Sequence, residues 1–425
     1  MDIPRVRTVL ALALLVVPLL LAGQAQAVEP QPTGTRLPAG LYGYGAATVG
    51  ANGYLLGGAH EGNQFTADIL QLTPSGGASK VAELPAPRGE PGVASIGGTV
   101  YIFGGTTSTP NGFPTSTSSI YTFQPGNGDA QELLGTSLPV SVTQTSAVRL
   151  GAYIYLFGGF SITGDQENPG FDWRDTIWRF NPENGDIQTM DVRLPTGRSQ
   201  VTAVVHEERV LLLGGLAEND ASGQLCGDPD RAVCVTDDIL SFRPQGLSGT
   251  LEKLGELPQP TRWSTAALVD GVVYLLGGCA TNCGPHHGQD TILTLDPVTG
   301  EVTELPVRMP AKGGRRAAVV FGQQALLPGG VRSDPAYPQE AENPSRADDR
   351  VHRIQLGATR PWAPASLQAH PADGGGIELT WQPPAYDGGA PVMSYEVHRA
   401  TGGGEPQRLT EVAAPATSFV DKQAK

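Results

Sequence analysis

Six Gly-Gly pairs recur along this chain, and each one ends an apolar run. The pairs are Gly57-Gly58, Gly104-Gly105, Gly158-Gly159, Gly214-Gly215, Gly277-Gly278 and Gly329-Gly330. Successive first glycines lie 47, 54, 56, 63 and 52 residues apart. A period of this size indicates a supersecondary unit that cannot bury its apolar face alone and stacks on its neighbours. The sequence therefore predicts a repeat architecture.

Each unit has the pattern of short antiparallel strands. An apolar run such as 100–103 precedes the Gly-Gly pair, and a tight-turn signal such as Asn52-Gly53 lies upstream of it. A second strand follows, as at 68–70, and a last one ends in Leu-Pro. The chain has 56 Gly and 36 Pro among its 425 residues, which is too turn-rich for a helical bundle. Four strands per unit predict an all-β fold, a β-propeller of six blades.

The apolar-Gly-Gly signature, the Asp-x-apolar strand after it and the Leu-Pro-x-x-Arg element resemble the kelch repeat. The resemblance covers about residues 34–357. It departs from the kelch pattern where a Trp usually opens the fourth strand, because that position is mostly aliphatic here. In the sixth unit, Pro328 replaces an aliphatic residue.

The ends of the repeat region predict how the ring closes. The strand at 351–356 leaves the sixth unit without a fourth strand, and the N-terminal segment 33–45 carries the missing Leu-Pro at Leu37-Pro38. We therefore expect an N-terminal strand to complete the last blade, which removes two exposed sheet edges.

The N-terminus is typical of an export signal. Arg5 and Arg7 precede an apolar run, and an A-x-A cleavage pattern ends at Ala27. Residues 1–27 are thus predicted to be a signal peptide, so that the mature protein is secreted or exposed at the cell surface and keeps no stable membrane span; an uncleaved anchor is the alternative. The net charge of −14 argues against nucleic acid as a partner, since phosphate contacts need a basic face.

Beyond the repeats, the composition changes. The segment 377–381 is a period-two strand that carries a Trp, and further strands are predicted at 395–399 and 418–421. This order resembles a fibronectin type III module, an immunoglobulin-like sandwich. We therefore predict a propeller over residues 28–357 and a partial, truncated fibronectin type III domain over residues 358–425.

The connection after each Gly-Gly pair is long and differs from unit to unit, and binding sites usually lie on such loops. Repeated arginines precede the units on the same face, where guanidinium groups could hold carboxylates; arginines in this position bind acidic ligands in some kelch propellers. The alternative is that each arginine braces a neighbouring blade. Two tryptophans nearby could stack on a sugar or a peptide. The predicted ligand-binding residues are Arg88, Arg198, Arg262, Trp263, Arg315, Arg316 and Trp173.

All four cysteines lie in two of the long loops. In an exported protein an even cysteine count indicates disulfides, and pairing within each loop, Cys226–Cys234 and Cys279–Cys283, is the simplest connectivity. No metal or other cofactor is predicted. The rival hypothesis is a zinc site made by Cys279, Cys283, His286 and His287.

The leading functional prediction is an exported, non-catalytic protein that binds an extracellular protein or glycan through its long-loop face. Six-bladed, exported kelch proteins include sialic-acid epimerases, so a sugar-modifying enzyme is the first alternative, and a structural cell-envelope component is the second. No Ser-His-Asp order or HExxH motif occurs. The sequence does not indicate an oligomeric state.

Overall fold

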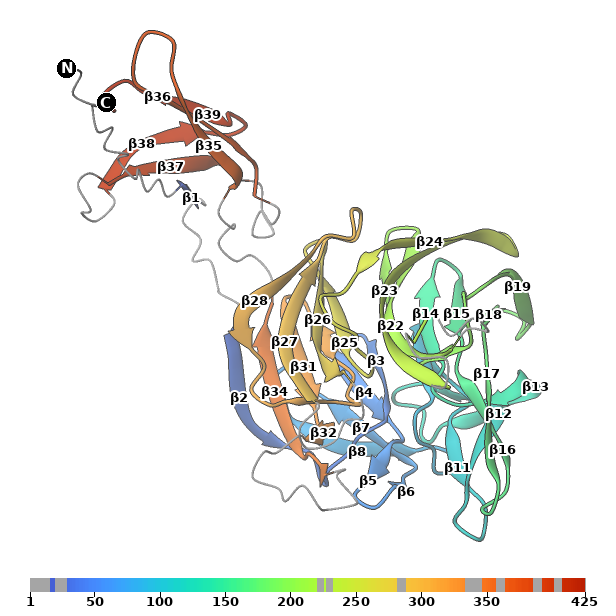
Figure 1. The fold of residues 1–425 in the computed structure, drawn as a ribbon. Helices are drawn as coiled ribbons and strands as arrows, with labels where there is room; N and C mark the ends of the chain where they lie inside the picture. The colour runs from blue at the N-terminus through green and yellow to red at the C-terminus, as the bar shows by residue number, and fades with distance from the viewer. Residues whose placement is uncertain are drawn as a thin grey trace. The chain divides into compact units, whose positions relative to one another are not determined.

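The computed structural model describes residues 16–19, 29–219, 225–226, 232–280, 288–332, 346–356, 364–384, 392–400 and 407–424. All regular secondary structure in these residues is β, which confirms the predicted all-β class (Figure 1). None of the described residues belongs to a helix that is long and apolar enough to cross a membrane. The chain divides into two compact units, one of residues 29–356 and one of residues 357–425 together with residues 1–28.

In the larger unit, six antiparallel sheets of the described chain share one strand order. Sheet 1 comprises β3 (Gly45–Val49), β4 (Asn52–Leu56), β7 (Asp68–Leu72) and β8 (Ala78–Glu83). Sheet 2 comprises β9 (Gly92–Ile96), β10 (Thr99–Phe103), β12 (Pro114–Phe123) and β13 (Gln131–Val142). Sheet 3 comprises β14 (Ser146–Leu150), β15 (Tyr153–Phe157), β18 (Thr176–Phe180) and β19 (Ile187–Arg193).

The next two sheets repeat this order. Sheet 4 comprises β21 (Thr202–His206), β22 (Arg209–Glu218), β23 (Val233–Gln245) and β24 (Ser248–Glu256). Sheet 5 comprises β25 (Thr265–Val269), β26 (Val272–Cys279), β27 (Gly288–Leu295) and β28 (Val302–Arg308).

Sheet 6 is built from both ends of the unit. It comprises β30 (Val319–Phe321), β31 (Gln324–Pro328), β34 (Arg350–Gln355) and, beside β34, β2 (Glu29–Arg36). The register pairs Glu29 with Gln355 and Arg36 with Arg350. An N-terminal strand thus occupies the fourth place in this sheet, as the sequence predicts, but it begins four residues before the predicted segment. Leu37 follows it directly and is buried in the core.

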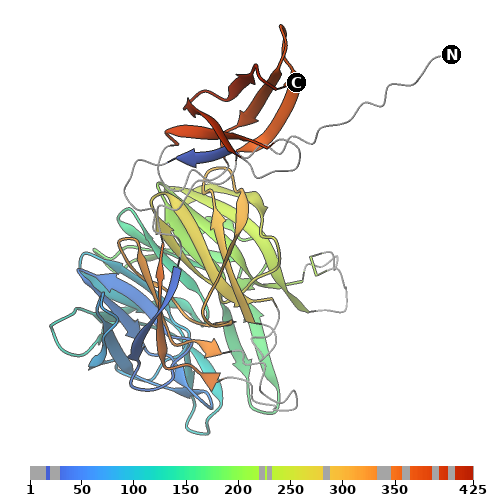
Figure 2. The same ribbon diagram turned by 90° about the vertical axis from the view of Figure 1, so that its left-hand side faces the viewer.

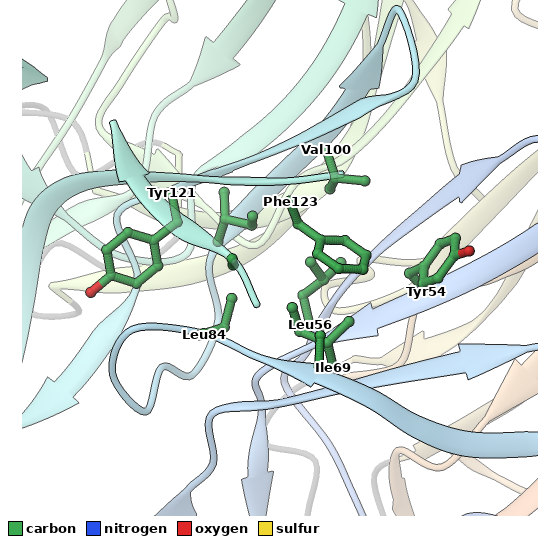
Figure 3. Packing of buried hydrophobic residues seen from close by; sticks show 10 residues of the cluster. Tyr54, Leu56, Ile69, Leu84, Val100, Tyr121 and Phe123 are labelled. Atoms are coloured by element: carbon green, nitrogen blue, oxygen red, sulfur yellow. The ribbon is translucent and has the colours of Figure 1, made fainter. Parts of the chain in front are cut away.

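Apolar side chains fill the spaces between consecutive sheets. Figure 3 shows one such cluster, in which Leu56 and Ile69 of sheet 1 pack with Val100 and Phe123 of sheet 2. The rings of Tyr54 and Phe123 meet edge to face with centroids 5.4 Å apart. Equivalent clusters join sheets 2 and 3, 3 and 4, and 4 and 5, and another joins sheet 6 to sheet 1. The alternating apolar residues of each strand therefore serve two neighbouring sheets.

Shorter strands elaborate the connections. Those between the second and third strands of a sheet are β5 (Ala59–His60), β6 (Gln64–Phe65), β11 (Thr106–Ser108), β16 (Phe160–Gly164), β17 (Pro169–Trp173), β32 (Val331–Arg332) and β33 (Arg346–Ala347). Two more, β20 (Arg198–Ser199) and β29 (Gly313–Gly314), lie in the connections that lead to the first strands of sheets 4 and 6. In Figure 2 the hairpins between the second and third strands of sheets 1 to 3, coloured blue to green, lie at the lower end of these sheets. The predicted long-loop face therefore carries its own local structure.

The smaller unit contains two three-stranded sheets. One has the order β35 (Ala365–Pro371), β36 (Ile377–Gln382), β39 (Ser418–Asp421). The other has the order β1 (Val16–Leu19), β37 (Ser394–Arg399), β38 (Gln407–Ala413). Trp381 and Tyr395 are buried between them with ring centroids 5.3 Å apart. The structure thus has the predicted strands at 377–381, 395–399 and 418–421, and β1 comes from the segment predicted to be the export signal.

Candidate functional site

Six equivalent residues meet at the centre of the larger unit. Each lies 14 positions before the first glycine of its repeat: Gly43, Glu90, Gln144, Gln200, Trp263 and Arg315. All six have left-handed backbone conformations, with φ between 51° and 60°. For a non-glycine residue this conformation costs about 1–3 kcal/mol, and such strain clusters at functional sites. Five neighbouring residues bear this cost.

Backbone hydrogen bonds join these six residues in a closed cycle. The N–H of each donates to the carbonyl oxygen of its equivalent in the preceding repeat, with N···O distances from 2.6 to 3.4 Å. The cycle closes where Gly43 N donates to Arg315 O at 2.9 Å. We call these six residues the central ring.

Side chains of the central ring, together with that of Arg262, form a chain of hydrogen bonds. Arg262 Nη1 donates to Gln200 Oε1 at 3.2 Å, and Gln200 Nε2 donates to Gln144 Oε1. Gln144 Nε2 then donates to Glu90 Oε2, while Arg315 Nε donates to Glu90 Oε1 at 3.0 Å and Arg315 Nη2 donates to the same oxygen. Both carboxylate oxygens of Glu90 therefore accept hydrogen bonds from other ring residues.

Aromatic rings hold the two arginines. The guanidinium carbon of Arg262 lies 4.2 Å from the ring centre of Trp263, and that of Arg315 lies 4.4 Å from the same ring and 5.0 Å from that of Tyr42. Burial lowers the pKa of Arg262 to about 10, and the charge of Arg315 adds to this effect. Arg262 is still protonated at neutral pH, so these contacts are cation–π interactions.

Two cavities are lined by residues of the central ring. A cavity of about 410 Å³, the loop-face cavity, extends among the connections of sheets 1 to 3 and is bounded by Phe65, Phe160 and Phe171. A second cavity of about 140 Å³ is lined by residues that precede or begin the first strand of every sheet. Gly43, Glu90, Gln144 and Arg315 line both cavities, so they form the floor of the loop-face cavity.

The structure separates the arginines that were predicted to share one ring. Arg262 and Arg315 donate hydrogen bonds to side chains of the central ring. Arg88 and Arg198 are buried and contact strands of sheets 2 and 4 instead. Relative to the first glycine of the repeat, Arg88 and Arg198 lie 16 positions upstream, Arg262 lies 15 and Arg315 lies 14. Adjacent residues of a chain point in different directions, so these positions do not superpose.

Arg88 and Arg198 brace the sheets, which is the alternative that the sequence left open. The Arg88 guanidinium lies 3.8 Å from the ring centre of Tyr121, and its Nη2 donates to Ser119 Oγ at 2.8 Å. Arg198 Nη2 pairs with Asp238 Oδ2 at 2.9 Å. Burial raises the pKa of Asp238, but Arg198 and Lys253 outweigh this effect and hold it below its usual value.

Of the seven predicted residues, only Arg315 lines the loop-face cavity, while Trp263 and Arg316 line the smaller one. Trp173 on β17 packs on the lining residue Phe160 with ring centroids 5.1 Å apart. Arg316 is buried, and its side chain runs close to Gly330. Among the described residues it has no hydrogen-bond partner.

The cysteine predictions fall partly outside the described residues. Cys226 and Cys234 form a disulfide, as predicted. Cys279 is also disulfide-bonded, so its sulfur is not available as a zinc ligand. Cys283, His286 and His287 lie outside the described residues. Among the residues that are described, no cluster of metal-ligating side chains occurs.

Sequence reasoning missed Glu90, Gln144, Gln200 and Tyr42 as site residues. The signal was present, because aligning the six repeats on their glycine pairs places the central ring in one column. The residue type at this aligned position changes from repeat to repeat, so looking for one residue type that recurs in every repeat does not find it. Phe171 gives no periodic signal, because the connections that follow the glycine pairs differ in length and sequence from repeat to repeat.

No protein-family model matches the chain. A protein described as a kelch domain-containing protein, from Archaeoglobus fulgidus, is 27% identical over 258 residues, which are 60% of this chain and 67% of that protein. The solved structure of YjhT is similar in fold, with a TM-score of 0.57 and 13% identity, over 82% of this chain and 99% of that one. Together with the antiparallel sheets, these likenesses support a kelch-type β-propeller.

Proposed function

We propose that this chain is an exported, non-catalytic binding protein that recognises a glycan or a protein through the loop-face cavity. The propeller has six blades, each formed by one of sheets 1 to 6, and β2 closes it. The closed hydrogen-bond cycle of the central ring supports this blade count, because its first and last members bond directly. The observation that carries the function is the cavity of about 410 Å³ above that ring, a size within the range of small-ligand sites.

The state of Glu90 favours binding over catalysis. A general acid or base needs a carboxylate that can exchange its proton with a ligand. Both oxygens of Glu90 are engaged by Arg315 and Gln144. This carboxylate therefore acts as an acceptor that orients its neighbours.

Phe171 provides the direct test. Its side chain is 56% exposed at the cavity wall, so replacing it removes contact area without opening the core. We expect Phe171→Ala to weaken binding on a glycan array or in an extracellular-protein pull-down by at least about tenfold. Leu134→Ala is the matched control, because Leu134 is 84% exposed and lies outside the cavity. Equal binding by wild type and Phe171→Ala would exclude this cavity as the site.

A sugar-modifying enzyme is the second candidate. Its specific support is that the carboxylate of Glu90 and the side chain of Tyr42 both line the same cavity. The test is a mutarotation assay on sialic acids. Turnover that disappears in Glu90→Gln, in a protein that remains folded, would establish the enzyme.

Export and the second domain belong to the same proposal. The Cys226–Cys234 disulfide is compatible with an oxidising compartment. We propose that residues 1–27 are removed after export and that residues 358–425 are part of a fibronectin type III-like domain, supported by the strand order β35-β36-β39 opposite β37-β38. Protein recovered from the medium of an expressing culture should begin at Val28. A secreted chain that still begins at Met1 would reject signal cleavage.

A further inference from the structure

We propose that the ligand of the loop-face cavity is a neutral saccharide and that the pairing of Glu90 with Arg315 excludes acidic sugars. This inference rests on the proposed binding function and specifies its ligand class. It is carried by two properties of the lining, the chemistry of the wall and the charge balance of the floor.

The wall is apolar and aromatic. Phe160 and Phe171 meet edge to face with centroids 5.5 Å apart, and Phe65 and Ile162 line the same cavity from two different connections. More than half of the Phe171 side chain is left exposed. An aromatic face that a fold leaves uncovered inside a concave site offers a stacking platform.

The floor, in contrast, is polar and hydrogen-bonding. Glu90 and Gln144 line it. Elsewhere in the lining, Asn63 adds an amide whose oxygen accepts from the Tyr42 hydroxyl. A pyranose ring fits this division, because it presents C–H bonds on one face and hydroxyl groups around its rim. The stacked face would lie on the aromatic wall while the hydroxyls reach the floor. A cavity of about 410 Å³ accepts a mono- or disaccharide more readily than a folded protein surface.

The charge balance sets the class of sugar. Among the described residues that line the cavity, the charged ones are Glu90 and Arg315, and they are paired with each other. Arg315 directs both Nε and Nη2 at one oxygen of Glu90, so its bidentate edge is already occupied. A ligand carboxylate would have to displace Glu90 from Arg315 and would then lie beside it. A like charge at this distance is strongly unfavourable in a partly buried site.

The experiment uses the full mature chain on an array that carries neutral oligosaccharides and their sialylated or uronic-acid counterparts. We expect wild type to bind neutral members at least about tenfold more tightly than the acidic counterparts. Glu90→Gln leaves the charge of Arg315 without a carboxylate partner and should reverse this preference, so that acidic members bind this variant at least about tenfold more tightly than they bind wild type.

Glutamine suits this backbone position, because the central ring already holds Gln144 and Gln200 at equivalent places with the same left-handed conformation. The double variant Glu90→Gln with Arg315→Gln restores a neutral floor and should restore the preference for neutral glycans. It also keeps the test available if the single variant does not fold.

The outcomes separate this inference from the proposed function. Preferential binding of acidic glycans by wild type, or an unchanged preference in folded Glu90→Gln, overturns the neutral-saccharide assignment and leaves glycan binding intact. Failure of wild type to bind any glycan on the array, with capture of a protein instead, overturns the saccharide assignment altogether.

Discussion

Gly43 and Arg315 come from the two ends of the larger unit, and the backbone N–H of Gly43 donates to the carbonyl oxygen of Arg315 at 2.9 Å. This bond closes the central ring. The same closure occurs further out, where β2 pairs with β34, and in the apolar cluster that joins sheet 6 to sheet 1. Three layers of contact, at different distances from the centre, therefore hold the first and last repeats together.

The closing strand should be essential for the stability of the larger unit. Deleting residues 29–36 removes β2 and leaves β34 with an unpaired edge, which favours aggregation. We expect a loss of soluble monomer on size-exclusion chromatography. Both proteins are made without residues 1–27, so that they lack β1 alike and differ only in residues 29–36; the chain that keeps β2 is the control. A stable, monomeric protein without β2 would show that the closure between the first and last repeats does not depend on this strand.

In five of the six glycine pairs, an added side chain at the first glycine should be destabilising for a reason beyond the dihedral angle, because its Cβ would lie 2.0–2.3 Å from a backbone carbonyl oxygen. A Cβ on Gly158 would lie 2.0 Å from the carbonyl oxygen of Arg198, whereas one on Gly151 would meet nothing within 4 Å, although φ is 59° and 63° at the two positions. Gly151→Ala should therefore cost only the left-handed strain of about 1–2 kcal/mol.

Gly158→Ala should cost about 1–3 kcal/mol more than Gly151→Ala, because the neighbouring repeat must move away. The measurement is the free energy of unfolding in urea for both variants. Equal losses would mean that the close approach between repeats contributes nothing.

The bracing role of Arg198 predicts a loss of stability without a loss of specificity. Its side chain is 1% exposed, and removing it leaves Asp238 with only the exposed Lys253 as a partner. We expect Arg198→Ala to lower the free energy of unfolding by about 3 kcal/mol, as for a broken buried ion pair. Arg193→Ala, at an exposed pair with Asp175, should cost less than about 1 kcal/mol. Reduced ligand affinity in folded Arg198→Ala, with stability unchanged, would contradict this assignment.

Asp348 should make the sixth sheet sensitive to acid. Burial raises the pKa of this carboxyl, but His352 and the Nε and Nη2 donors of Arg350 outweigh the effect and hold it well below its usual value. A lowered folded-state pKa stabilises the fold above the unfolded value, about 3.9, and this contribution is lost as the pH falls further. Asp348→Asn should therefore cost about 3 kcal/mol at neutral pH and progressively less below about pH 4.

Urea unfolding of wild type and Asp348→Asn from about pH 6 to pH 2 measures this convergence. Asp349→Asn is the control, since its carboxylate is 34% exposed and pairs with the exposed Arg36. Parallel stability profiles for wild type and Asp348→Asn would rule out a role for this carboxyl in acid sensitivity.

The repeat pattern predicted the scaffold well, because each glycine pair, turn and apolar alternation is a local signal. The place of β2 was also predictable, since a sheet lacking one strand needs a partner. The site was predicted less well. The sequence has arginines at similar distances from the glycine pairs, namely Arg88, Arg198 and Arg315. A difference of two positions along the chain decides whether the side chain lies at the central ring or is buried against a sheet. Only the backbone geometry distinguishes them.

The central ring has a consequence for how such a site can change. Its six hydrogen bonds join backbone N–H and carbonyl groups, so closure of the ring requires a particular backbone conformation but no particular side chain. Glycine, glutamate, two glutamines, tryptophan and arginine all satisfy it here. If the proposed binding function holds, the residues that contact the ligand are ones whose identity the architecture leaves unconstrained, so the specificity of this centre can change by substitution while the scaffold is kept.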